Sequence, residues 1–321
     1  MQNSELFGDG NPSIVERLGE RHKRIITANL DAFDGASVLD LASNNGRWSY
    51  AALNAGAAKV TSIEGRAERV EMAQGIFRQL GLANRVDCHI GDMFRWLWAH
   101  ENDRFDTVLC LGVYYHITDH YGFLKQIART QPKTIIIDSG FVRSFRNGVF
   151  IMTENPRQHK NALPTHKGQA HEFAGSVSLG MMIQMAWNLG YNCRPVVWDP
   201  KEVDAPLTVI DYLTGIRFTL RLDKMEGFRD ADWQSHWRDA LGRLSPDFVH
   251  LVDPTLHDVV AESVTRSPRK LIQNDCTIME LPEDQAAQTS TARGKTAYLI
   301  KSLRRFASRA RSFARRQLFR R

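Results

Sequence analysis

The chain has 321 residues, of which 43% are hydrophobic and 24% charged, with 22 Gly and 11 Pro. This composition excludes collagen-like, low-complexity and wholly disordered proteins, and it leaves room for a large core. The formal net charge of +6 hides an asymmetry, because residues 285–321 hold eleven Lys or Arg and no acid. The other 31 basic residues face 36 acidic ones, so residues 1–284 carry −5 and the basic character belongs to the C-terminal segment.

The four cysteines, Cys88, Cys110, Cys193 and Cys276, stand apart from one another and form no CxxC pair. No His is spaced to complete a zinc site with them, so we interpret them as reduced thiols. The sequence shows neither a cationic, apolar N-terminal leader nor an apolar run of about 18 residues. We therefore expect a cytoplasmic protein.

Residues 1–36 are expected to form a covering helix, because apolar residues between Ser13 and Leu30 recur at helical spacing. From residue 37 onward, short apolar runs alternate with helical segments that end at glycines. This alternation predicts right-handed crossovers and a parallel sheet. The expected strands are 37–42, 59–64, 86–90, 105–111 and 134–138, and the expected helices are 47–54, 68–80, 93–101 and 121–130.

Residues 140–175 break this pattern, and their polar, irregular composition predicts an inserted loop or lid. A helix is expected over 178–189. Two late strands, 193–198 and 216–222, predict an antiparallel hairpin at the sheet edge, which we attribute to their late position and a short link. The core domain is then expected to span residues 37–224.

The last third of the chain is expected to be an addition to this domain. Residues 225–288 contain Trp233 and Trp237 at helical spacing and then a polar linker. Residues 289–321 predict a basic amphipathic helix. Its apolar stripe is Leu299, Leu303, Phe306, Ala310 and Phe313, interleaved with arginines.

Ligand chemistry is expected at the carboxyl ends of the strands, where an open α/β sheet leaves a crevice. In the segment VLDLASNNGRW the first strand runs into a turn and then a helix, so backbone N–H groups face the crevice. Gly46 permits close approach of the backbone, and Ser43, Asn44 and Asn45 are small or tolerate a turn.

Two carboxylates follow the next two strands. Glu64 ends the second strand eighteen residues after Gly46 and is placed to accept hydrogen bonds from both hydroxyls of a ribose. Asp92 follows the third strand, where it can accept from an adenine amino group while Met93 packs on the ring. Either acid alone is more often a solvated strand-end carboxylate, and their joint placement is what favours an adenosine-shaped site.

Five segments in this order resemble the class I S-adenosylmethionine-dependent methyltransferases: VLDLASNNG, SIEG, GDMF, FDTVLCLGVYYH and PKTIIIDSG. The resemblance covers roughly residues 37–222. It implies an α/β fold, namely a Rossmann-like, mostly parallel seven-stranded sheet with helices on both faces and a late antiparallel hairpin, plus helical N- and C-terminal additions. The usual D-x-G-x-G-x-G motif has Ala42 and Asn44 in place of two glycines. The implied cofactor is S-adenosyl-L-methionine, and the residues implied to bind it are Asp40, Ala42, Ser43, Asn44, Gly46, Glu64, Asp92, Met93 and Leu111.

The candidate catalytic residues lie just beyond the fourth strand, beside the expected position of the reactive methyl group. His116 is the best base candidate, because neutral imidazole has a suitable pKa for taking a hydroxyl proton, and Tyr115 accompanies it. The alternative is a hydrogen-bonded structural histidine that closes the strand end. His116 and His120 have the i,i+4 spacing of metal ligands, but the acid of an HExxH motif is absent, so we expect no metal.

Two classes of function follow. The first is methyl transfer to a small-molecule, sugar or lipid-linked acceptor by O-methylation, with a tRNA-modifying relative as a variant because of the GVYYH segment. The acidic body argues against RNA, which needs a basic groove. The second class is a non-catalytic nucleotide-binding or membrane-associated protein. A dinucleotide dehydrogenase is less favoured, since no G-x-G-x-x-G follows the first strand.

The basic segment 289–321 bears on partners and location. An anionic membrane would satisfy both its apolar stripe and its charge, whereas nucleic acid would satisfy only the charge. The alternative is that the stripe packs on the acidic body of the protein itself. We expect peripheral association with the inner membrane surface, with the methyl acceptor as the other, unidentified partner.

Overall fold

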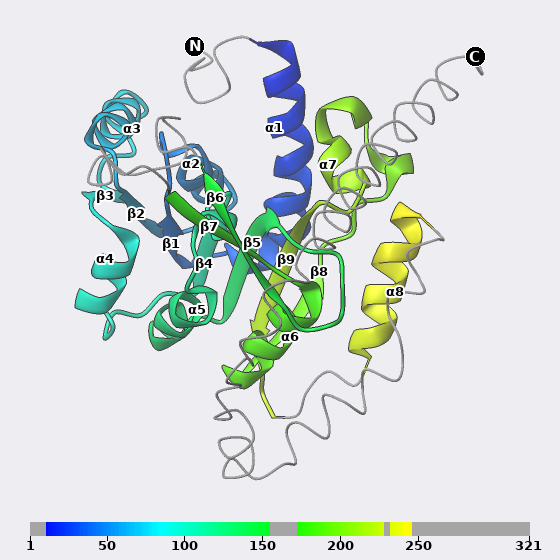
Figure 1. The fold of residues 1–321 in the computed structure, drawn as a ribbon. Coiled ribbons are helices and arrows are strands. Elements are labelled where there is room, and N and C mark those ends of the chain that lie inside the picture. The colour runs from blue at the N-terminus through cyan, green and yellow to red at the C-terminus, as the bar shows by residue number, and fades with distance from the viewer. Residues whose placement is uncertain (1–10, 155–171, 228–231, 246–321) are drawn as a thin grey trace, which may run out of the picture. The chain divides into compact units, whose positions relative to one another are not determined.

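A computed structural model describes residues 11–154, 172–227 and 232–245 (Figure 1). Seven strands form one sheet in the order β3-β2-β1-β4-β5-β9-β8, in which β9 runs antiparallel to both of its neighbours. This confirms the expected seven-stranded, mostly parallel sheet. The strands are β1 Ser37–Leu41, β2 Lys59–Glu64, β3 Val86–Ile90, β4 Thr107–Leu111, β5 Thr134–Gly140, β8 Tyr191–Pro195 and β9 Arg217–Lys224.

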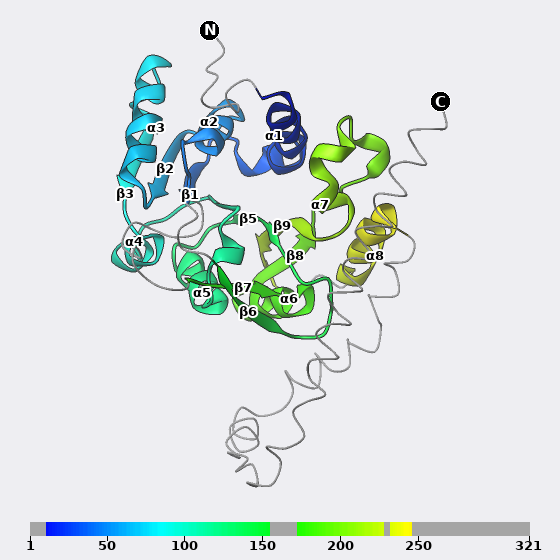
Figure 2. The same ribbon diagram turned by 45° about the horizontal axis from the view of Figure 1, so that its top comes forward.

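Helices cover both faces of the sheet: α1, α2 and α3 lie on one side and α4, α5 and α6 on the other (Figure 1, Figure 2). Apolar side chains of α1, α2 and the central strands form a buried core, in which Ile25, Phe33, Val38 and Ala52 have at most 2% exposure. The helices are α1 Pro12–Ile25, η1 Thr27–Ala32, α2 Arg47–Asn54, α3 Ala67–Gln79, α4 Met93–Ala99, η2 Tyr114–His116, α5 His120–Arg129, α6 Leu179–Asn188, η4 Pro200–Glu202, η5 Pro206–Val209, α7 Ile210–Leu213 and α8 Trp233–Leu244.

The strand order reverses direction between β1 and β4. β1 pairs in parallel with β2 on one side and with β4 on the other. The connections on the two sides of this point therefore leave the sheet in opposite directions, which opens a crevice at the carboxyl ends of the two strands. The loops that carry the candidate site residues begin here.

The expectation of an irregular loop or lid over residues 140–175 is wrong for two parts of that segment. Val149–Glu154 forms β6 and Glu172–Val177 forms β7, and the two pair as a separate antiparallel sheet. Most of β6 is exposed, because it pairs with β7 instead of covering the core. The sequence therefore lacks the in-and-out alternation by which a half-buried strand is recognised.

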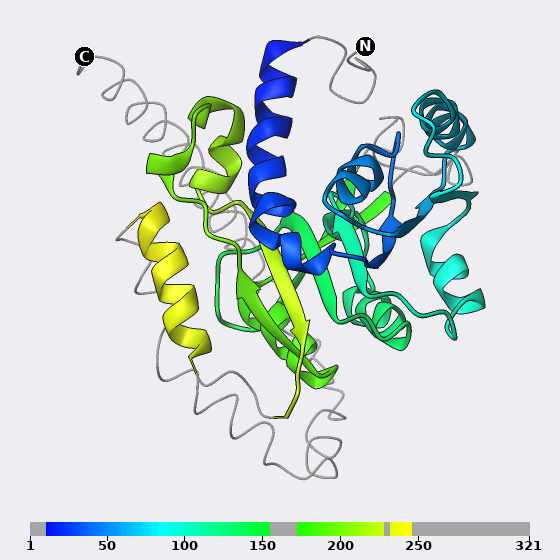
Figure 3. The ribbon, with the colours of Figure 1, turned by 180° about the vertical axis from the view of Figure 1, so that it is seen from behind.

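The late antiparallel hairpin is confirmed, but its short link is wrong. Between β8 and β9 the chain forms η4, η5 and α7, and α7 lies next to α1 in the ribbon (Figure 1). Seen from behind in Figure 3, α8 packs on β8, where the Trp237 indole N–H donates to the Cys193 carbonyl at 3.2 Å. The expected basic helix at 289–321 lies outside the described residues. Within the described part of the chain, no helix is long and apolar enough to cross a membrane.

Candidate active site

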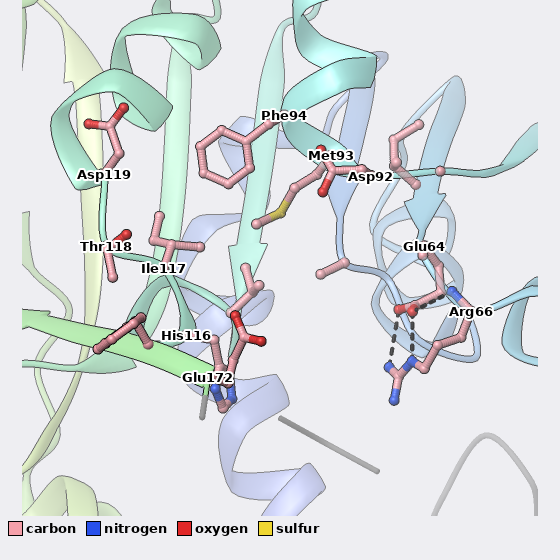
Figure 4. Close-up of a pocket in the computed structure, with 16 residues that line it drawn as sticks. Glu64, Arg66, Asp92, Met93, Phe94, His116, Ile117, Thr118, Asp119 and Glu172 are labelled. Atoms are coloured by element: carbon pink, nitrogen blue, oxygen red, sulfur yellow. Dashed lines mark hydrogen bonds and ion pairs between the residues drawn. The ribbon is translucent and has the colours of Figure 1, made fainter. Parts of the chain in front are cut away.

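A cavity of about 320 Å³ lies at the carboxyl ends of β1 to β4, with β7 on its opposite side (Figure 4). The loops after four neighbouring strands thus meet the inserted hairpin at one place. The lining contains four acids, one arginine and one histidine among apolar side chains. Its residues are Ala42, Ile63, Glu64, Gly65, Arg66, Gly91, Asp92, Met93, Phe94, Val113, His116, Ile117, Thr118, Asp119, Glu172 and Phe173.

The loop after β1 has left-handed backbone at three alternate positions. Ala42 has φ 56°, Asn44 has φ 55° and Gly46 has φ 78°. A Cβ at Gly46 would lie 2.8 Å from Cζ of Phe77, so only glycine lets α2 begin this close to α3. The two departures from the family's glycine pattern therefore keep glycine-like backbone, with Asn44 tolerating it well and Ala42 at a cost in strain.

Glu64 lies at the end of β2 with 3% exposure. Its Oε2 accepts from the Asn44 backbone N–H at 2.9 Å, which ties the loop after β1 to β2. Its Oε1 accepts from the Arg66 Nε at 2.8 Å, and Figure 4 shows this ion pair beside the cavity. The Asn44 side-chain Oδ1 is buried with no hydrogen-bond partner among the described residues, so a donor from a ligand would satisfy it.

Behind this loop, Asp40 is buried with 1% exposure and accepts from the Ser49 hydroxyl at 2.7 Å. Burial, together with the nearby charge of Glu64, raises the pKa of Asp40 to about 7. Ser43 is also buried, and its Oγ accepts from the Ser62 hydroxyl at 2.7 Å. The hydrogen bonds of Asp40 and Ser43 thus hold the loop after β1 against α2 and β2.

Asp92 and Met93 line the cavity at the end of β3. The Asp92 carboxylate caps α4 by accepting from the Arg95 N–H at 2.9 Å through Oδ1, which leaves its other oxygen for a ligand. Leu111, the last residue of β4, is 9% exposed. Four of the nine residues expected to bind cofactor, namely Ala42, Glu64, Asp92 and Met93, therefore line one cavity. The other five stand in or beside the loop after β1, or at the end of β4.

His116 lies at the end of η2, and its Nδ1 is 2.8 Å from Oε2 of Glu154. Both side chains are 20% exposed. Because the carboxylate engages Nδ1, Nε2 is the ring nitrogen left for a substrate proton. Glu154 ends β6, 38 residues further along the chain, and nothing in the sequence pattern pointed to it. Only the hairpin brings it to the site.

Tyr115 and His120 have different surroundings. The Tyr115 ring lies 4.2 Å from the His116 ring, and the Arg217 guanidinium lies 5.5 Å from the Tyr115 ring centroid. His120 is 2% exposed, and its Nε2 is 3.1 Å from the carbonyl oxygen of Gly175 in β7. A Cβ at Gly175 would lie 2.7 Å from Cε1 of His120, so the hairpin rests directly on this ring.

The chain's own residues fit S-adenosyl-L-methionine. The left-handed loop after β1 brings the backbone close to the cavity. Glu64 lines the cavity with a carboxylate that can accept from the hydroxyls of a ribose. The Asn44 Oδ1, which has no hydrogen-bond partner among the described residues, can accept from a ligand donor. Met93 and Phe94 offer a non-polar surface on which the adenine ring can pack (Figure 4).

Residues 32–178 match the model of a protein family described as "Methyltransferase domain". Among solved structures, the chain is similar to the N-terminal domain of EvdMO1 with SAH bound, with 20% identity, TM-score 0.47, and coverage of 66% of this chain and 81% of that one. Magnesium protoporphyrin IX methyltransferase (ChlM) from Synechocystis PCC 6803 with bound SAM gives 16% identity, TM-score 0.45, and coverage of 69% and 89%. An S-adenosylmethionine dependent methyltransferase from Mesorhizobium loti gives 12% identity, TM-score 0.46, and coverage of 62% and 95%. No curated protein matches the chain.

The family match spans the strands and loops that build the cavity, from η1 to the end of β7. It agrees with the resemblance found in the motifs after β1, β2, β3, β4 and β5. The match to a methyltransferase domain over residues 32–178 thus agrees with the predicted resemblance to the class I S-adenosylmethionine-dependent methyltransferases.

Proposed function

We propose that the chain methylates a hydroxyl group of a small-molecule, sugar or lipid-linked acceptor. The observation that carries this proposal is the contact at 2.8 Å between Glu154 and His116, which lines the cavity together with the loops that fit the cofactor. When bound, S-adenosylmethionine supplies a methyl group on a positively charged sulfur, which an oxygen nucleophile can attack. A hydroxyl is a weak nucleophile until it loses its proton, so a positioned base is the feature that O-methylation needs.

In this proposal His116 takes the hydroxyl proton at Nε2. Its Nδ1–H donates to Glu154, which fixes the orientation of the ring and stabilises the imidazolium that forms. Glu154 is therefore a positioning residue. Tyr115, whose ring lies beside the imidazole, helps to hold the acceptor against the base.

The charges that line the cavity support a small acceptor over RNA. Four acids, Glu64, Asp92, Asp119 and Glu172, face one arginine and one histidine there. A polyanion approaching this mouth would be repelled, because RNA binding needs a basic groove. Exposed apolar residues of the hairpin, including Phe173 at 58% exposure, instead offer contact area to an apolar part of an acceptor.

The proposal is tested with full-length protein, methyl-labelled S-adenosylmethionine and fractionated cell extract. Label entering lipid or soluble metabolites and not RNA supports it. His116→Gln should lower turnover by roughly 10²–10⁴-fold with cofactor affinity unchanged, since the role is proton transfer. Glu154→Gln should lower turnover less and change its pH profile. His22→Gln on the exposed surface of α1 is the matched control. Unchanged turnover in His116→Gln would make His116 a structural residue.

We further propose that the chain is cytoplasmic and associates peripherally with anionic membranes through residues 289–321. The support is the sequence alone, since eleven Lys or Arg and no acid occur in residues 285–321. Co-sedimentation with anionic liposomes should be stronger for the full chain than for a chain ending at residue 289, and salt should weaken it. Equal recovery of both chains would contradict this location.

A further inference from the structure

Beside the active site, two arginines share one buried carboxylate. Asp138, near the end of β5, is 0% exposed. Its Oδ1 accepts from Arg217 Nε at 2.6 Å and from Arg21 Nη2 at 3.1 Å. The two arginine side chains are only 12% and 13% exposed. Both cations are therefore largely removed from water.

The remaining partners of Asp138 are neutral. Its Oδ2 accepts from the Tyr212 hydroxyl at 2.7 Å and from the Thr219 hydroxyl at 3.0 Å. Burial alone would raise the pKa of Asp138, but Arg21 and Arg217 outweigh it and hold the pKa at about 2. The carboxyl is thus charged throughout the range in which proteins usually work.

The cluster consequently carries one positive charge in excess. Asp211, which directly precedes Tyr212, accepts from Arg17 at 2.8 Å and 2.7 Å and is neutralised by it. The Nε of Arg21 is buried and has no hydrogen-bond partner among the described residues. Burying an unbalanced charge and an unsatisfied donor is unfavourable, and a bound anion relieves both.

The cluster lies next to the candidate catalytic residues. Arg21 comes from α1, which lies between α2 and α7 in Figure 1, and Arg217 opens β9. The Arg217 guanidinium lies over the Tyr115 ring, and Tyr115 precedes the proposed base His116. The residues that fit the cofactor's adenosine lie instead after β1, β2 and β3.

We propose that Arg21 and Arg217 bind an anionic group of the methyl acceptor, a carboxylate or a phosphate. This inference rests on the proposed methyl transfer and names the class of its substrate. A planar guanidinium pair suits the oxygens of either anion, and stacking on Trp48 and Tyr115 holds the two guanidinium groups in place. The acids of the cavity mouth repel the same anion, so the charges orient the acceptor with its hydroxyl toward His116.

The experiment uses the full-length protein saturated with S-adenosylhomocysteine, which occupies the cofactor's own place. Inorganic phosphate and, separately, acetate are titrated by calorimetry at low ionic strength. Arg21→Gln should weaken anion binding roughly tenfold or more, and Arg21→Lys, which keeps the charge, should weaken it less. The eleven basic residues in 285–321 bind the same background of anion in every variant. Comparing variants therefore isolates the arginine pair.

Arg24→Gln is the matched control, because Arg24 lies on the same helix at 14% exposure but is balanced by Glu202 at 3.1 Å. Anion binding should be the same as in the wild type. Thermal unfolding should show Arg21→Gln to be folded, since Arg217 still neutralises Asp138. A stronger response to phosphate than to acetate assigns a phosphate acceptor, and the reverse assigns a carboxylate.

Three results would overturn the inference: equal anion binding in Arg21→Gln and Arg24→Gln, no binding at all in the wild type, or binding that appears only when S-adenosylhomocysteine is absent. The last result would mean that the two arginines bind the carboxylate of the cofactor and not the acceptor. These outcomes do not depend on turnover. A failure of the base proposed at His116 would thus leave the anion site standing, and the converse also holds.

Discussion

Replacing Glu64 by Gln tests the cofactor site most directly. The carboxylate is 3% exposed at the end of β2, where it faces the cavity and already accepts from Asn44 and Arg66. A ribose diol would add hydrogen bonds to a charged acceptor, each contributing about 1.5–3 kcal/mol. Glutamine keeps the shape and one acceptor oxygen, so about one such bond is lost. The dissociation constant should rise by roughly 10- to 150-fold.

Calorimetry with S-adenosylhomocysteine measures this change. Glu68→Gln is the matched control, because Glu68 is an exposed acid in the first turn of α3, outside the cavity lining. Removing the Glu64 charge should also lower the pKa of Asp40, which that charge helps to raise. An unchanged dissociation constant in a folded Glu64→Gln protein would refute the assignment of Glu64 to the ribose.

Three further predictions concern Arg66, Asp40 and Ala42, which lie in or beside the loops after β1 and β2. The Arg66 side chain donates to both carboxylate oxygens of Glu64, which a ribose would also use. Arg66→Met should therefore tighten cofactor binding about two- to fivefold, as measured by calorimetry. Weaker binding would mean that Arg66 itself contacts the cofactor. Asp40 keeps its proton up to a pKa of about 7 when folded but only to about 3.8 when unfolded, so stability should fall as pH rises through this window. Asp40→Asn should remove up to about 4 kcal/mol of that fall in urea unfolding, and an identical pH dependence in both proteins would contradict the shift. Ala42→Gly should raise the free energy of unfolding by about 0.5–1 kcal/mol, because φ 56° strains alanine; a loss of stability would show that the strain is absent.

The parts that the sequence predicts are those set by local pattern. Short apolar runs bounded by glycines predict β1 to β5, and the acids at strand ends predict the positions of Glu64 and Asp92 at one edge of the sheet. Residue type alone does not reveal that Ala42 and Asn44 both adopt left-handed backbone, since most residues in such positions are glycine. The left-handed backbone of the loop after β1 is therefore a property that only the structure reveals.

The parts that the sequence does not predict depend on pairing between distant segments. Glu154 reaches His116 only because β6 pairs with β7 and β7 packs beside η2. In the same way, Arg21 and Arg217 are 196 positions apart and meet only at Asp138. No period or spacing in the chain encodes either contact, because each follows from how finished elements pack.

The close contact at Gly175 means that position 175 of the hairpin tolerates no side chain, whereas other positions of the hairpin do. Any side chain there would press on the ring of His120 and on the Ile117 carbonyl, at 2.7 Å and 2.8 Å, and would lift β7. Since β6 is paired to β7, Glu154 would then leave His116. The outward residues Phe150 and Ile151, 52% and 54% exposed, bear no such constraint. In the proposed mechanism, acceptor preference can therefore diversify along β6 while His116 and Glu154 stay in contact, so long as position 175 remains glycine.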